Sequence, residues 1–254
     1  MKDTVYKYDI PVRTALLADL HDCPFGEIIS SLEKRGPELI CIAGDAFHRA
    51  VSHEEGPVIS QSRNMLPFLR ACAQIAPAFF SPGNHEWRFT AEDIAAVADT
   101  GVKVLDNCFV SFRGMTVGGL SSASYSAHRD YRILGAEHSP GLADGERPGR
   151  AEPETDWLAD FCSCPGYKLL LCHHPEYRDI YLKDLPIDLI LCGHAHGGQI
   201  RLFGRGLYAP GQGAFPKYTS GVHGNMIISK GLANTGGMIP RLFNPREVVY
   251  IEPE

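Results

Sequence analysis

The chain has 254 residues, a formal net charge of −6 and 44% hydrophobic residues. A chain of this size can bury a substantial core, and α/β proteins of this length often form one domain, so we expect a single domain over residues 1–254. Charged residues of both signs are scattered along the chain, which argues against a protein that holds duplex nucleic acid mainly by neutralising its phosphates. A local basic cleft stays compatible with this composition.

The sequence shows neither a signal-peptide pattern nor a membrane-spanning pattern. Residues 1–11 include lysines but no apolar run, and no segment reaches the ~18 apolar residues that a spanning helix needs. Several of the eight cysteines, such as Cys41, Cys72 and Cys172, lie inside apolar runs, which is typical of reduced, packed thiols. We therefore expect a soluble, cytoplasmic protein.

The first half of the chain predicts strands that alternate with helices. Short apolar runs predict strands, and longer amphipathic stretches predict helices. Gly36-Pro37 ends the first helix, Thr90 caps the third, and Pro67 weakens or kinks the second. The predicted order is strand 14–18, helix 27–35, strand 39–43, helix 63–73, strand 78–81 and helix 92–99.

The second half of the chain is richer in predicted strands. Residues 102–120 contain three short β-like pieces, and residues 121–150 form a polar, glycine-containing stretch without a clear period, which is typical of a mobile loop or lid. A helix is predicted around residues 155–161. Further strands are predicted at 169–172, 189–192 and 248–251.

Side chains that can bind metals follow five of the predicted strands. They are Asp19 and His21, Asp45, Asn84, His173, and His194 with His196. Side chains two positions apart on an extended backbone point the same way, so each Asp/His or His/His pair can act together. Manganese, iron and zinc accept mixed carboxylate and imidazole ligands, and the two oxygens of an aspartate such as Asp45 can bridge two ions. We expect these groups to meet at one edge of a sheet as a binuclear hydrolytic centre.

These motifs resemble those of the calcineurin-like metallophosphoesterases, in the same order and from about Thr14 to the C-terminus. The matching motifs are Asp19-Leu-His21, Gly44-Asp45, Gly83-Asn84-His85-Glu86, His173-His174-Pro175 and Gly193-His194-Ala195-His196. Residues 197–199, Gly231 and residues 239–245 look like the subgroup that includes UDP-diacylglucosamine hydrolases and related phosphodiesterases. The resemblance implies an α/β fold in which two mixed β-sheets pack face to face between outer helices.

The resemblance also implies the ligands of two divalent ions, with manganese expected first and iron or zinc as alternatives. One ion would be held by Asp19, His21, Asp45 and His196, and the other by Asp45, Asn84, His173 and His194. Two ions about 3.5–4 Å apart would bind the phosphate oxygens and generate the hydroxide that attacks phosphorus. His85 corresponds to the family histidine that protonates the leaving oxygen or stabilises charge in the transition state.

Several residues outside this ligand set are candidates for substrate contacts. Arg49, Arg88 and Arg201 could bind a substrate phosphate, because a guanidinium forms paired hydrogen bonds to its oxygens; solvated surface arginines are the competing interpretation. His173, not His174, aligns with the family ligand two positions before proline, so His174 is expected to orient substrate or a ligand.

Some features of the sequence distinguish it from other branches of the family. His48 stands where purple acid phosphatases carry a metal-binding tyrosine, so we expect no tyrosinate-to-iron colour, and contact of His48 with the metals or substrate is a hypothesis. Cys23 is expected to be a packed thiol. The Gly-Asp-x-x-Asp-Arg-Gly arrangement of protein phosphatases is absent, which argues against that activity.

The expected function is hydrolysis of a phosphodiester or pyrophosphate bond in a small substrate, with diesters preferred over monoesters. A nuclease would share the same centre but would need a long basic groove, which the acidic balance disfavours. A noncatalytic scaffold for protein partners is the second alternative, although such a scaffold is free to lose ligands and this chain keeps all of them. The metal, the oligomeric state and peripheral membrane contact through a lipid-linked substrate stay open.

Overall fold

Two six-stranded sheets form the centre of the structure, a computed structural model that describes residues 1–48, 56–122, 152–233 and 240–254. The first sheet contains, in spatial order, β1 (Lys2–Tyr8), β16 (Glu247–Pro253), β2 (Thr14–Leu17), β3 (Leu39–Ala43), β4 (Ala78–Ser81) and β5 (Lys103–Val104). The second contains β14 (Gly221–His223), β15 (Met226–Ile228), β9 (Leu189–Cys192), β8 (Tyr167–Cys172), β7 (Met115–Leu120) and β6 (Cys108–Phe112). Both sheets mix parallel and antiparallel pairs.

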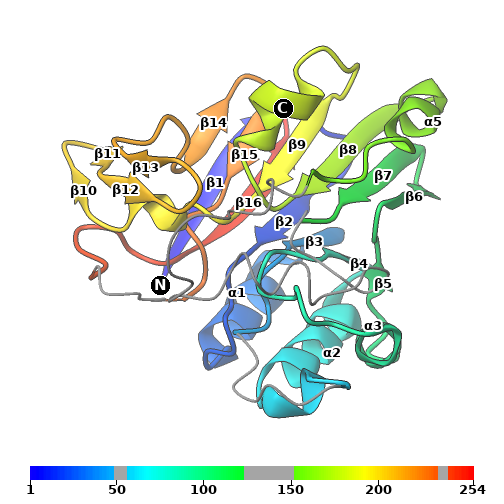
Figure 1. The fold of residues 1–254 in the computed structure, drawn as a ribbon, viewed down its shortest axis with the longest axis horizontal. Coiled ribbons are helices and arrows are strands. Elements are labelled where there is room, and N and C mark those ends of the chain that lie inside the picture. Colours follow the sequence, from blue (N-terminus) through cyan, green and yellow to red (C-terminus); the bar gives the residue numbers. More distant parts are fainter. Residues whose placement is uncertain (49–55, 123–151, 234–239) are drawn as a thin grey trace, which may run out of the picture.

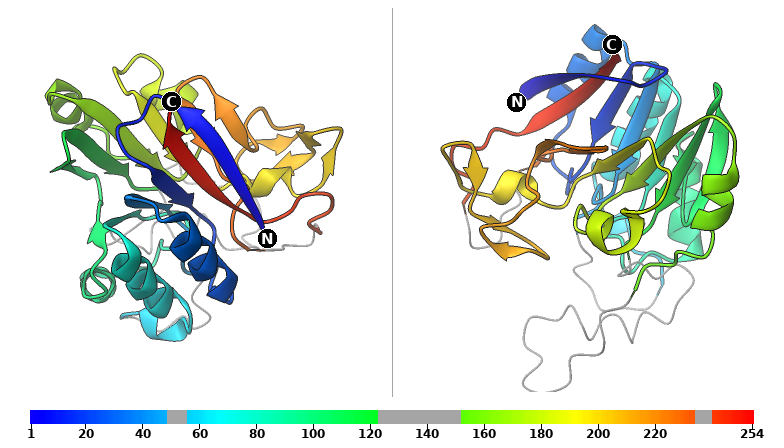
Figure 2. Two further views of the ribbon diagram at one scale, coloured as in Figure 1. Left: turned by 180° about the vertical axis from the view of Figure 1, so that it is seen from behind. Right: turned by 90° about the horizontal axis from the view of Figure 1, so that it is seen from above.

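The two sheets pack face to face through apolar side chains from both. Leu16, Cys41 and Phe79 of the first sheet share one buried cluster with Val117 and Leu171 of the second. Three helices, α1 (Gly26–Arg35), α2 (Met65–Ile75) and α3 (Ala91–Ala98), cover the outer face of the first sheet. The outer face of the second carries α5 (Leu158–Ser163) and the single-turn π-helix η2 (Arg178–Leu182) (Figures 1 and 2). These layers confirm the predicted α/β fold with two mixed sheets between helices.

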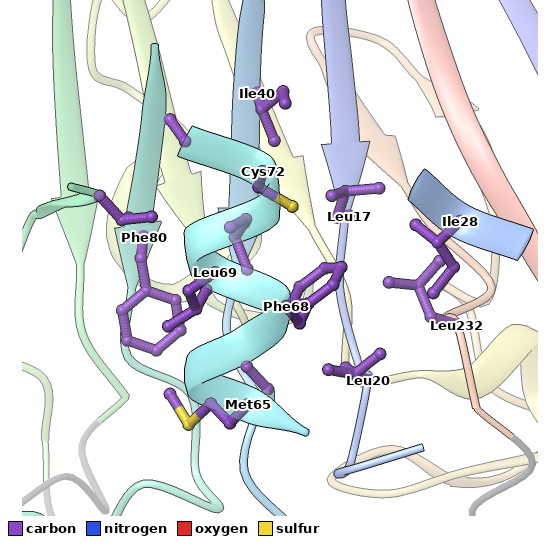
Figure 3. Close-up of a cluster of buried hydrophobic side chains, with 14 of the residues drawn as sticks. Leu17, Leu20, Ile28, Ile40, Met65, Phe68, Leu69, Cys72, Phe80 and Leu232 are labelled. Atoms are coloured by element: carbon purple, nitrogen blue, oxygen red, sulfur yellow. The ribbon is translucent and has the colours of Figure 1, made fainter. Parts of the chain in front are cut away.

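Helix α2 shows how the sequence pattern produces this packing. Met65, Phe68, Leu69 and Cys72 recur at the spacing of one helical face, and all four are buried against the sheet (Figure 3). Pro67 lies in the first turn, where backbone N–H groups have no partner within the helix, so it is accommodated without breaking the helix. Pro67 therefore does not interrupt the helix, which extends to Ile75.

Strand β1 is the main element that the sequence did not predict. It pairs in parallel with β16 from Lys2↔Glu247 to Tyr8↔Pro253, so its partner lies at the other end of the chain. It forms the edge of the sheet, and its residues are only partly buried. An edge strand needs no continuous apolar run, so the sequence carried little signal for it.

The remaining short elements lie mostly between β9 and β15. They include the hairpins β10 (Arg201–Leu202) with β11 (Arg205–Gly206) and β12 (Tyr208–Ala209) with β13 (Gly213–Ala214), and the 3₁₀ turns η1 (Ile59–Gln61) and η3 (His196–Gly198). None of the helices in the described ranges has the length and hydrophobicity that crossing a bilayer requires. The predicted loop 121–150 lies outside the described residues from residue 123 onward.

Candidate metal centre

The candidate ligands follow the carboxyl ends of strands in both sheets. Strands β2, β3 and β4 are parallel neighbours, as are β8 and β9, so the loops that follow the strands of each set leave the sheet at the same edge. The first two loops run side by side, because the backbone N–H of Asp19 donates to Gly44 O at 3.1 Å and that of His21 donates to Asp45 O at 3.0 Å. The loops that carry Asp19, His21 and Asp45 are therefore neighbours.

The backbone at these loop positions is unusual. Asp19, His21, Asp45, His194 and His196 all have positive φ, between 46° and 65°. Residues other than glycine rarely adopt this left-handed conformation, and it persists where the surrounding structure enforces it, as at functional sites. The conformation turns the chain sharply at the strand ends and brings the five side chains together.

Two groups of ligand atoms lie next to each other. In the first, Asp19 Oδ1 is 3.9 Å from His21 Nε2 and 3.5 Å from His196 Nε2. In the second, Asp45, His173 and His194 each offer a ligand atom within 4.8 Å of the others. Asp45 Oδ2 lies 3.0 Å from His173 Nε2 and 3.8 Å from His21 Nε2, so it connects the two groups.

The chemistry of these atoms fits divalent cations. His173 Nδ1 bonds to the carbonyl of Ala43 at 2.7 Å, and since a carbonyl only accepts, Nδ1 carries the proton and Nε2 faces the centre. His173 Nε2 lies beside the Asp45 carboxylate, and Asn84 Oδ1 is buried without a hydrogen-bond partner. Buried polar atoms are normally satisfied, so an amide oxygen left unpaired is suited to bind a cation.

The electrostatics of the centre also suit cation binding. Burial lowers the pKa of His21, His194 and His196, which keeps these imidazoles neutral and their lone pairs available at neutral pH. Burial raises the pKa of Asp45, but the surrounding imidazoles, with His173 foremost, bring it well below its ordinary value. His173 differs, because the carboxylates of Asp45 and Asp19 overcome the effect of burial and raise its pKa to about 10.

His85 lies beside the two groups of ligand atoms. Its backbone N–H donates to Asp45 Oδ1 at 2.8 Å, and its Nε2 lies 3.9 Å from Asp45 Oδ2. Its Nδ1 bonds to the carbonyl of His48, so the proton sits on Nδ1 and Nε2 is directed towards the centre. Burial lowers the pKa of His85, although 28% of the side chain stays exposed. An exposed, oriented imidazole is suited to exchange a proton with a bound molecule.

Two further histidines predicted near the centre are placed close to it. The ring of His48 lies 5.8 Å from that of His21 and 5.9 Å from that of His85, measured between centroids. His174 is 4.0 Å from the ring of His194, and its nitrogens bond to Ser122 Oγ at 2.9 Å and Glu176 Oε1 at 3.1 Å. His174 is therefore a neighbour of His194, and its role in orienting a ligand stays a prediction.

The structure describes two of the three arginines that were candidates for substrate contacts. Arg88 is buried, with 7% exposure, and its guanidinium lies over the ring of Trp87 at 5.8 Å from the ring centroid. Arg201 donates to Gly197 O at 2.8 Å, so it supports the turn that carries His196. Arg49 lies outside the described residues. Cys23 is half-buried.

Three supporting residues had no role assigned from the sequence. Glu86 is fully buried and accepts hydrogen bonds from the backbone N–H groups of Asp45, Phe47 and Gly83 at 3.0, 3.0 and 2.7 Å. Asn244 donates to His196 O at 2.7 Å, and Gly231 lies against the Asp19 side chain. All three stood in the quoted motifs, but their contacts depend on pairs distant in sequence.

The chain is similar in sequence to known proteins. The family model described as "Calcineurin-like phosphoesterase" matches residues 12–198. Phosphodiesterase YaeI of Escherichia coli (strain K12) is 26% identical over 206 residues, which cover 76% of this chain and 63% of that protein. An uncharacterized metallophosphoesterase of Helicobacter pylori (strain ATCC 700392 / 26695) is 22% identical, over 96% of this chain and 60% of that protein. The chain thus spans less than two thirds of the length of these relatives.

Among solved structures, the protein TT1561 of Thermus thermophilus is similar with a TM-score of 0.43 and 14% sequence identity. The likeness covers 72% of this chain and 81% of that one.

Proposed function

Because this chain belongs to the calcineurin-like phosphoesterase family, we propose that it hydrolyses a phosphodiester or pyrophosphate bond at a centre of two divalent cations. The position of Asp45 carries this proposal, since one carboxylate lies within 4 Å of imidazoles from both groups of ligand atoms. A carboxylate shared in this way is the usual bridge of a two-metal hydrolytic site.

The proposed ligands divide as the two groups of atoms do. Asp19, His21, Asp45 and His196 would hold one ion, and Asp45, Asn84, His173 and His194 would hold the other. When bound, the cations would polarise the phosphoryl oxygens and supply hydroxide at neutral pH. We propose manganese as the preferred metal, with iron and zinc as alternatives, because all three accept this mixed oxygen and nitrogen set.

We propose His85 as the proton donor to the leaving oxygen. The carbonyl of His48 holds the Nδ1 proton, so Nε2 is the atom directed at the substrate, and it donates only in the imidazolium form, in which both ring nitrogens carry a proton. The hydrogen bond from the backbone N–H of His85 to Asp45 Oδ1 holds His85 beside the metal centre. Its partial exposure leaves a path for substrate to approach.

The proposed substrate is a small phosphoester, with a diester preferred. The similarity to a protein named phosphodiesterase supports the diester, and the net charge of −6 supports a small molecule over nucleic acid. We also propose a cytoplasmic location, which the eight free cysteines support.

The test compares turnover of bis(p-nitrophenyl) phosphate and p-nitrophenyl phosphate with added manganese in wild type, Asp45→Asn and Asp160→Asn. Asp160 is an exposed aspartate on α5 and serves as the matched control. We expect faster turnover of the diester by wild type and at least a ~100-fold loss of kcat/KM in Asp45→Asn. Asp160→Asn should keep both activity and metal content.

Metal content, measured by elemental analysis, separates the possible failures. Two ions per wild-type chain and fewer in Asp45→Asn would support the shared carboxylate. Two bound ions without turnover of any phosphoester would favour the noncatalytic scaffold, whereas no bound ion at saturating manganese, iron or zinc would overturn the proposal. Faster turnover of the monoester would overturn the diester preference alone.

A further inference from the structure

An apolar surface lies outside the metal centre on two segments that are distant in sequence. Phe203 and Phe243 are 104% and 80% exposed, and their neighbours Leu202 and Leu242 are 44% and 45% exposed. We name these four residues the aromatic face. Single exposed apolar residues are ordinary on protein surfaces, but a gathered group marks an interaction site.

The two segments are joined by hydrogen bonds and share a hollow. Arg201 N donates to Leu242 O at 3.0 Å, and Leu242 N donates to Gln199 O at 3.2 Å. A shallow hollow of about 350 Å³ is lined by Phe203 and Phe243, together with Arg201, Leu202 and Gly204. The aromatic face is therefore one surface rather than two separate exposed side chains.

The backbone holds both phenylalanines in an unfavourable conformation. Phe203 has φ of +50° and Phe243 has φ of +53°. For a bulky residue this left-handed region is a genuine outlier, and it costs conformational energy. Burial of the ring does not offset this cost, because both rings are exposed. A strained residue whose ring stays exposed is expected where the ring contacts a binding partner outside the chain.

The charge around the aromatic face is positive. From residue 189 to residue 246 the chain has no Asp or Glu, although it contains 30 acidic residues in total. Arg201 and Arg241 donate to neutral main-chain carbonyls such as Gly197 O and Ala233 O, and the carboxylate of Glu247 offsets part of their charge. Arg205 is exposed at the hairpin next to Phe203. In the part of the chain that the structure describes, none of these three arginines lies in an ion pair.

We propose that the aromatic face docks the protein onto an anionic lipid bilayer. Phe203 and Phe243 would enter the boundary between headgroups and acyl chains, while the exposed Arg205 faces the lipid phosphates and Arg201 and Arg241 add positive charge behind it. Aromatic and aliphatic side chains combined with nearby cations are what interfacial binding requires, because burial of apolar area and attraction to anionic headgroups add together. The aliphatic Leu202 and Leu242 favour acyl chains over nucleic-acid bases, on which they cannot stack.

The aromatic face is also linked to the metal centre. Asn244, which follows Phe243, donates to His196 O at 2.7 Å, and Gly206 of β11 packs closely on Gly198. Figure 1 shows the small hairpins β10 to β13 grouped at one side of the molecule, apart from the helices α1 to α3. Docking through this side would hold the centre near a membrane surface. The docking does not depend on hydrolysis, since none of the four side chains of the aromatic face is a proposed ligand.

The test is sedimentation of the full chain with vesicles of phosphatidylcholine containing about 30% phosphatidylglycerol, compared with pure phosphatidylcholine. We expect wild type to bind the anionic vesicles, and the binding to weaken as salt rises from about 0.05 to 0.5 M. Phe203→Ser/Phe243→Ser should lower the partition coefficient at least ~10-fold, and Arg205→Glu should lower it several-fold.

The matched control variants change exposed apolar and charged residues that lie outside the aromatic face. Ile180→Ser/Val5→Ser replaces two exposed apolar residues outside the aromatic face, and Arg70→Glu reverses an exposed charge on α2. Both controls should bind vesicles as wild type does. The melting temperature and the turnover of bis(p-nitrophenyl) phosphate should be the same in the phenylalanine variant as in wild type, which shows that the fold is retained.

Three outcomes would overturn the proposal. The first is no binding of wild type to either vesicle, and the second is equal binding by wild type and Phe203→Ser/Phe243→Ser. The third is that the aromatic face binds something other than lipid. Light scattering would then show a wild-type dimer that the phenylalanine variant does not form, or single-stranded DNA would bind more strongly than vesicles.

Discussion

Glycines determine how closely the candidate ligands approach each other. A Cβ on Gly83 would collide with Asp45 Oδ1, and one on Gly193 would lie 2.5 Å from Ala18 Cβ and 2.9 Å from Asp19 Oδ2. Gly231 has φ of +85°, and its Cβ would lie 2.9 Å from both Cβ and Oδ2 of Asp19. At these positions the absence of a side chain leaves the space that the carboxylates occupy.

Gly231 is distant in sequence from Asp19, but its replacement by alanine should impair the metal centre. We expect Gly231→Ala to displace Asp19 and to lower manganese affinity and kcat/KM by ~10–100-fold, as loss of a supporting contact at a metal site does. Calorimetric titration with manganese and steady-state turnover would measure the two effects.

Gly114→Ala is the matched control, because Gly114 has a similar φ of +78° but an added Cβ would meet no atom within 4 Å. It should lose about 1–2 kcal/mol of stability from backbone strain and keep its metal affinity. Equal losses of affinity in both variants would show that strain, and not contact with Asp19, is responsible.

At the scale of elements, one buried side chain connects the loops that follow β3 and β4. Glu86 accepts the N–H groups of Asp45 and Phe47 from the first loop and of Gly83 from the second. These loops carry Asp45 and Asn84, so their relative position sets the distance between two proposed ligands. Burial, followed by the nearby charge of Asp45, raises the pKa of Glu86 to about 7 despite these donors.

Glu86→Gln should weaken this connection. The amide nitrogen of glutamine would replace one acceptor oxygen and face a backbone N–H, which leaves a buried donor unpaired and lowers the free energy of unfolding by ~1–3 kcal/mol. Metal affinity should fall as well, because the two loops lose their common anchor. Urea unfolding and metal titration would measure these losses.

Glu92→Gln, an exposed position in the first turn of α3, provides the control and should change neither quantity appreciably. A Glu86→Gln protein with wild-type stability and affinity would mean that the loops are positioned by other contacts.

At the scale of the whole molecule, the proposed ions would join the two sheets. Asp19, Asp45 and Asn84 follow strands of the first sheet, whereas His173 and His194 follow strands of the second. The sheets also meet through a cluster of apolar side chains. Ligands that converge from both sheets exist together only in the folded chain, so metal binding should stabilise the fold as a whole.

Manganese should therefore raise the melting temperature. At about 100 times Kd, binding contributes ~2.7 kcal/mol, which for a chain of this size corresponds to a rise of about 5–10 °C. Calorimetry with and without a chelator would measure it. The rise should be much smaller in Asp45→Asn, and a rise of the same size in that variant would contradict a centre that joins the sheets through Asp45.

Local signals in the sequence were sufficient to predict most central elements, and they singled out the proposed ligands. Strands β2, β3 and β4 are short apolar runs that end in glycine, proline or polar residues, and α3 begins at Thr90, whose side chain forms a capping box with Asp93. The ligands were recognisable because each follows such a strand. Their type and position depend only on neighbouring residues.

Contacts between residues far apart along the chain were decided only by the tertiary structure. The pairing of β1 with β16, the three N–H groups that Glu86 accepts, the support of His196 by Asn244 and the joining of Phe203 with Phe243 are all of this kind. The sequence by itself thus determined the order of the elements and the chemistry at their ends, because periodicity and turn residues act locally. Distances, burial and shared surfaces followed only once the two sheets had packed, since they arise from segments that the chain brings together by folding.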